Sequence, residues 1–70
     1  MRLSTRNQLA GTVTDVTIGA VMATVKVKLD GGDQIITASI TREAAEELGL
    51  AEGAAVYALV KSTEVMIGVD

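Results

Sequence analysis

The feature that most constrains the fold is an alternation of residue character that runs from Ala20 to Leu29. One set of alternate positions is entirely apolar: Val21, Ala23, Val25, Val27 and Leu29. The other set is mostly polar: Met22, Thr24, Lys26 and Lys28. A period of two places successive side chains on opposite faces of a β-strand. The segment therefore predicts a strand that turns one face to a core and exposes its two lysines to solvent.

Two further strands are expected around this one. Leu9–Ile18 is rich in β-branched residues and partly alternating, and Gly11 within it suggests a bulge or a close backbone approach. Asp30–Asp33 contains two glycines and reads as a hairpin turn that leads into a strand over Gln34–Ile40. The first half of the chain is therefore predicted to be a three-stranded antiparallel unit.

The pattern changes at Thr41, a good N-cap residue before the helix formers of Arg42–Leu48. Gly49 then supplies a helix stop. Ala55–Val60 is apolar at every position, which predicts a strand buried on both faces, and Val65–Val69 predicts a short final strand.

This order of three strands, a helix and two strands predicts an all-β fold, a five-stranded OB-like Greek-key barrel with one short helix between strands three and four. An SH3-like barrel is the alternative, although that fold usually lacks a helix of this length. No internal repeat or linker is visible, so residues 1–70 are expected to form one domain.

The size and composition predict self-association. A domain of 70 residues has a small core, worth only about 3–5 kcal/mol. Disulfides and Cys or His metal sites are excluded because the chain has neither residue, yet 49% of its residues are hydrophobic. We therefore expect a homo-oligomer that buries the excess apolar surface.

Several classes of function are disfavoured. Without Cys or His the chain lacks the commonest nucleophile and general base, and no catalytic pair is visible, so we expect no enzyme. A net charge of −3 and a single aromatic residue, Tyr57, argue against nucleic-acid binding. The longest apolar run, Ala54–Val60, is far shorter than the ~20 residues of a membrane helix, and no signal-peptide pattern follows Met1. A cytoplasmic protein with no membrane partner is expected.

Two polar segments next to predicted strands carry hydrogen-bond donors. Lys61–Thr63 offers an ammonium group and two hydroxyls, and Ser4–Asn7 offers hydroxyls, a guanidinium and an amide. Because the first strand of such a barrel commonly neighbours the fourth, the two segments are predicted to meet and bind an oxyanion, unless Glu64 neutralises the lysine. The alternative is an exposed turn and a fraying chain start, each with only local hydrogen bonds.

A second cluster, Gly19–Val21, can present backbone N–H groups to an anion, although an ordinary tight turn explains it equally well. The acidic side chains of the helix read as solubilising groups and not as a metal site. They are Glu43, Glu46 and Glu47.

Several spaced blocks of this sequence resemble the molbindin family, the molybdenum-pterin-binding proteins built from the Mop (TOBE-type) domain. The blocks are Ser4–Val13, Gly19–Ala23, Ile40–Thr41, Leu48–Leu50 and Val56–Val65. The resemblance covers nearly the whole chain. It implies an OB-like barrel, a homohexamer arranged as a trimer of dimers, and the binding of molybdate or tungstate without catalysis.

The resemblance also implies a storage, buffering or delivery role and two classes of site. The first lies between subunits and draws on Ser4, Arg6, Asn7, Lys61 and Ser62, with Thr41 from the neighbouring subunit. Ala44 stands where Ser is common in related domains, so one hydroxyl donor is missing. The second class lies near symmetry axes and corresponds to Gly19, Ala20 and Val21. A structural or protein-interaction module with no anion ligand remains the alternative.

Overall fold

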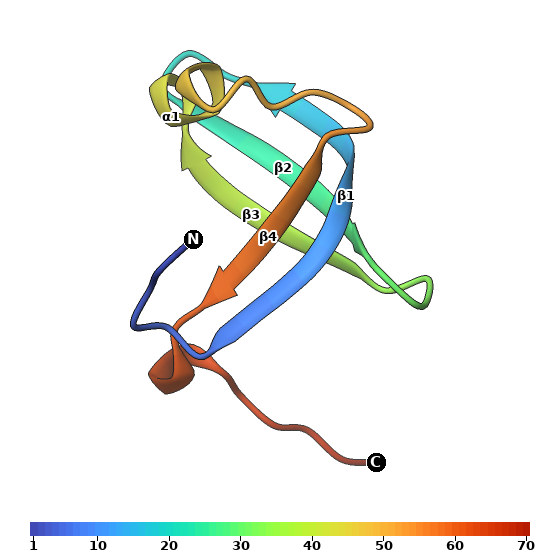
Figure 1. Cartoon of the computed structure of the whole chain (residues 1–70). Helices are drawn as coiled ribbons and strands as arrows, with labels where there is room; N and C mark the ends of the chain where they lie inside the picture. The colour runs from blue at the N-terminus through green and yellow to red at the C-terminus, as the bar shows by residue number, and fades with distance from the viewer.

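The computed structural model describes all 70 residues, which form a curled antiparallel sheet with one short helix at its end (Figure 1). The elements are β1 (Asn7–Ile18), β2 (Met22–Leu29), β3 (Ile35–Thr41), α1 (Arg42–Glu47), β4 (Ala55–Val60) and the 3₁₀ turn η1 (Ser62–Glu64). Neighbouring strands follow the order β3-β2-β1-β4. The chain contains no helix with the length and apolar character required to cross a bilayer.

The alternating segment forms β2, and its apolar face is the centre of the core. Ala23, Val25 and Val27 are at most 4% exposed, and Val13 of β1 packs against the two valines. Val21 had been expected on this face, but it precedes the strand and is 71% exposed. The predicted strand is therefore confirmed with a later start.

β1 is long and bends around this core. Its register with β2 shifts between Val13 and Asp15, which is a β-bulge. A Cβ atom added at Gly11 would lie only 2.5 Å from the carbonyl oxygen of Lys28. The close backbone approach expected at Gly11 is therefore confirmed, and the bulge lies a few residues further along.

The helix forms where the cap and stop residues predict it. Thr41 Oγ1 accepts a hydrogen bond of 3.1 Å from the backbone N–H of Ala44, which is N-cap geometry. Gly49 adopts a positive φ of 62° and donates its N–H to the Glu46 carbonyl, ending the helix. Buried Ala45 anchors α1 against the end of the sheet.

The expected fifth strand is absent, so the prediction of a five-stranded barrel is wrong in this respect. Residues 65–69 have an apolar strand pattern, but a strand needs a neighbouring edge, and this segment pairs with no other strand. It extends into solvent, with Met66, Ile67 and Val69 about nine-tenths exposed. All-β architecture with one short helix is confirmed, with four strands and an open sheet.

The expectation that β4 is buried on both faces is also wrong for a single chain. Val56, Ala58 and Val60 are half-buried on the concave face, whereas Tyr57 and Leu59 are exposed on the other. The chain forms one sheet, so no second sheet covers its outer face. Only 6 of the 70 residues are buried, which is a small core even for a domain of this length.

Candidate functional site

The pairing of β1 with β4 brings the two donor segments to one end of the molecule. The strands are antiparallel, and Asn7 lies opposite Val60, so the residues before β1 meet the residues after β4. Asn7 Nδ2 donates a hydrogen bond of 3.5 Å to Ser62 Oγ, and Thr5 Oγ1 donates one of 3.3 Å to the Val60 carbonyl. The Thr5 hydroxyl, part of the predicted donor segment, is thus donated to the backbone of β4, because the antiparallel pairing places it beside Val60.

The cations of this end are not neutralised within the chain. Arg6 and Lys61 are exposed, and neither forms an ion pair. The carboxylate that had been considered a competitor, Glu64, also makes no salt bridge. Ser4 is exposed in the same segment as Arg6. Arg6 and Lys61, which adjoin Asn7 and Ser62 in the sequence, therefore have no negative partner.

The backbone of η1 adds further donors. The Glu64 N–H donates to the Lys61 carbonyl over 2.9 Å, and the Val65 N–H donates to the Ser62 carbonyl over 3.4 Å. The N–H groups of Ser62 and Thr63 have no acceptor in the chain. Ammonium, guanidinium, hydroxyl, amide and free N–H groups thus gather at one end. This donor set suits an acceptor-only oxyanion.

Thr41 lies at the opposite end of the molecule from this cluster. It ends β3 beside α1 and pairs with Met22, whereas η1 follows the far end of β4 (Figure 1). Its Oγ1 accepts from Ala44, so the hydroxyl hydrogen is still free to be donated outward. One chain therefore does not bring Thr41 together with Arg6 and Lys61.

The second predicted cluster lies in a shallow hollow at the α1 end, lined by Ala20, Val21, Thr41, Arg42, Glu43 and Glu46. Gly19 uses its N–H in a 2.8 Å bond to the Met22 carbonyl, so only the N–H groups of Ala20 and Val21 are free. Arg42 is paired with Glu46 at 2.7 Å. Because carboxylates share the hollow, this end of a single chain is a poorer anion site than the Asn7–Ser62 end.

Comparisons with known proteins point to one family. The model of the TOBE domain matches residues 3–67. Molybdenum-pterin-binding protein MopA of Rhodobacter capsulatus is 51% identical over 67 residues, which are 96% of this chain but only 25% of that protein. Molybdenum-pterin-binding protein 2 of Clostridium pasteurianum is 48% identical over 96% of this chain and 97% of its own length.

A solved structure gives the same result. The structure of the cytoplasmic molybdate-binding protein ModG with molybdate bound superposes with a TM-score of 0.91 at 47% identity, covering 100% of this chain and 49% of that one. The agreement extends over every element of the fold described above. This chain belongs to the TOBE-domain family, with close relatives among the molybdenum-pterin-binding proteins.

Proposed function

We propose that this chain binds molybdate, without transforming it, at the end of the molecule where β1 begins and β4 ends. The groups that would hold the anion are Ser4, Arg6, Asn7, Lys61 and Ser62. Molybdate is a doubly charged tetrahedron that only accepts hydrogen bonds, so it needs donors on every side. Tungstate has nearly the same shape and charge and would occupy the same site.

The observation that carries the proposal is the contact between Asn7 Nδ2 and Ser62 Oγ, 55 residues apart in sequence. It joins the two donor segments and leaves Arg6 and Lys61 beside them without a carboxylate partner. Uncompensated cations repel one another, and a dianion between them would relieve that repulsion. Relatives whose names refer to molybdenum or molybdate support the choice of anion.

The site would be completed by a second copy. Thr41 lies at the other end of the molecule, so it would reach an anion at the Asn7–Ser62 end only from a neighbouring subunit. A hexameric trimer of dimers would satisfy this requirement. We propose that such an assembly stores, buffers or delivers the oxyanion in the cytoplasm, with a second anion at Gly19–Val21.

Titration calorimetry with molybdate, tungstate, sulfate and phosphate tests the proposal. We expect heat with the two metal oxyanions, and a loss of affinity of about tenfold or more in Lys61→Ala and Arg6→Ala, because each removes a charge-assisted donor. Lys26→Ala is the matched control, since it removes the same charge from an exposed position on β2.

Wild-type affinity in both Lys61→Ala and Arg6→Ala would place the site elsewhere. The absence of heat with either metal oxyanion would contradict the function itself. The many exposed apolar side chains favour a second candidate, a protein-interaction module. Native mass spectrometry separates the two, because an interaction module would form oligomers that carry no anion after exposure to molybdate.

A further inference from the structure

The segment that precedes β1 is held in place by side-chain hydrogen bonds alone. No backbone N–H or carbonyl group of residues 1–6 bonds to another backbone group. Among these six residues only Thr5 takes part in a hydrogen bond. Thr5 is half-buried, whereas its neighbours Ser4 and Arg6 are exposed. The position of these two donors therefore depends on how Thr5 is held.

Thr5 is held from two sides. Its Oγ1 donates a hydrogen bond of 3.3 Å to the Val60 carbonyl, and its own carbonyl accepts one of 2.8 Å from Gln8 Nε2. The other contact at this end, from Asn7 Nδ2 to Ser62 Oγ, is 3.5 Å long. The bond from Gln8 is the shortest of the three, and it closes only a short loop, which costs little chain entropy.

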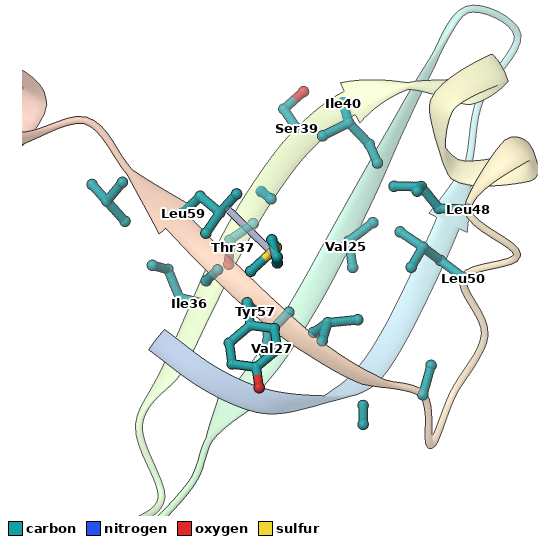
Figure 2. A pocket seen from close by; sticks show the side chains of 17 residues that line it. Val25, Val27, Ile36, Thr37, Ser39, Ile40, Leu48, Leu50, Tyr57 and Leu59 are labelled. Atoms are coloured by element: carbon teal, nitrogen blue, oxygen red, sulfur yellow. The ribbon is translucent and has the colours of Figure 1, made fainter. Parts of the chain in front are cut away.

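Gln8 itself stands on a fixed part of the sheet. It is the second residue of β1 and lies opposite Leu59 in the ladder with β4. Leu59 lies near the end of β4 that leads into η1 (Figure 2). Only the amide nitrogen of a glutamine can donate to a carbonyl, so the bond to Thr5 also fixes the orientation of the Gln8 carboxamide. The side chain thus joins the mobile start of the chain to a paired strand.

We propose that Gln8 is a positioning residue of the oxyanion site. By holding the Thr5 carbonyl, its carboxamide orders Ser4 and Arg6 before an anion arrives, and it acts through the main chain without touching the anion. A site whose donors are already ordered loses less conformational entropy on binding. The inference rests on the proposed function, because it assigns a residue to the same site.

Gln8→Met is the variant that isolates the hydrogen bond. Methionine keeps the length and the apolar stem beside Leu59 but has no amide donor. In titration calorimetry we expect the dissociation constant for molybdate to rise about three- to tenfold, the usual worth of one neutral hydrogen bond. Gln34→Met is the matched control, because Gln34 is exposed and its side chain makes no hydrogen bond. It should change the constant by less than about twofold.

Proteolysis tests the ordering of the segment without any anion. Trypsin can cleave after Arg2 and after Arg6, and of these two only Arg6 adjoins Thr5. The cleavage rate follows the population in which the segment is open. In Gln8→Met we expect cleavage after Arg6 to be about three- to tenfold faster, and cleavage after Arg2 to be unchanged. Peptides of residues 1–12 with each sequence correct for a direct effect of the new side chain on trypsin.

A double-mutant cycle separates positioning from a general effect on the fold. If Gln8 acts by ordering Arg6, then Gln8→Met has little left to disturb once Arg6→Ala is present. We expect its effect on the molybdate dissociation constant to fall below about twofold in that background. Two changes that act independently would instead multiply their effects on the constant.

Three results would overturn the inference and leave the proposed function intact. They are wild-type molybdate affinity in Gln8→Met, an unchanged rate of cleavage after Arg6, and fully independent effects in the cycle with Arg6→Ala. In each of them the wild-type protein still gives heat with molybdate. The absence of that heat would contradict the proposed function and this inference together, so the two kinds of failure are distinguishable.

Discussion

Gly11 is the residue at which the backbone of β1 has the least room. A Cβ at this position would lie 2.5 Å from the Lys28 carbonyl oxygen and 2.7 Å from Val27 Cγ1. The first of these neighbours is backbone, which has no alternative rotamer, and the second belongs to the core. The site therefore accepts only glycine without a shift of β1 against β2.

We expect Gly11→Ala to lower the free energy of unfolding by about 1–3 kcal/mol, the usual cost of overpacking. Gly32→Ala is the control, because an added Cβ there meets nothing within 4 Å and the residue does not have a positive φ. Urea unfolding at one fixed protein concentration measures the free energy of unfolding of both variants. Similar stability losses in the two variants would show that space at Gly11 is not limiting.

The two donor segments show how far sequence reasoning reaches at single positions. That Asn7 and Ser62 come together followed from strand order, because the first and fourth strands of such a barrel are neighbours. That Glu64 leaves Lys61 unpaired did not follow, because it depends on how η1 turns. Binding of an anion by this cluster stays a prediction.

The helix α1 depends on a single capping side chain. Thr41 Oγ1 accepts from the Ala44 N–H, and with only six residues the helix has few other backbone hydrogen bonds. We expect Thr41→Ala to cost about 1 kcal/mol of unfolding free energy and Thr41→Ser to restore most of it, because serine caps equally well. Chemical unfolding measures the free energy of unfolding of the two variants.

The same pair tests the place of Thr41 in the anion site. If its hydroxyl is donated to an anion held by the neighbouring copy, molybdate affinity falls in the alanine variant and is kept in the serine variant. A loss of stability with unchanged affinity would restrict Thr41 to its capping role. Ala44→Ser adds a hydroxyl one helical turn after Thr41. An increased affinity of this variant for molybdate would support the placement of the start of α1 at the anion site.

Elements whose partners lie inside the chain were predicted well. β2 and β3 pair with each other around the Asp30–Asp33 turn, and the alternation and the glycines are local signals for this hairpin. Residues 65–69 carry an equally clear strand pattern, yet they form no strand. Alternation indicates which residues share a face of a strand, but it does not indicate which neighbouring strand will pair with it. The pattern of residues 65–69 therefore predicted a strand face correctly placed for burial but could not predict that the chain itself offers this segment no paired edge.

The whole molecule has a small interior for the apolar surface that it carries. Its six buried residues contrast with many large apolar side chains that are exposed, among them Val21, Leu48, Tyr57 and Leu59. Exposed patches of this kind mark interaction surfaces. The exposed apolar side chains and the division of donors between the two ends of the sheet are the features that favour the proposed association of copies.

Association and anion binding should therefore be linked. If an anion is held by Arg6 and Lys61 of one copy and by Thr41 of another, it binds the assembly better than the separate chains, and by linkage it must stabilise the assembly. We expect molybdate at 100 times its dissociation constant to raise the unfolding midpoint and to lower the protein concentration at which oligomers dissociate. The free energy of stabilisation at this concentration is at most about 2.7 kcal/mol per site.

Sulfate, at equal ionic strength, is the control for screening. Dilution monitored by light scattering, with and without molybdate, measures the effect. An unchanged dissociation concentration in the presence of bound molybdate would mean that each copy holds its anion alone, and Thr41 would then have no part in the site.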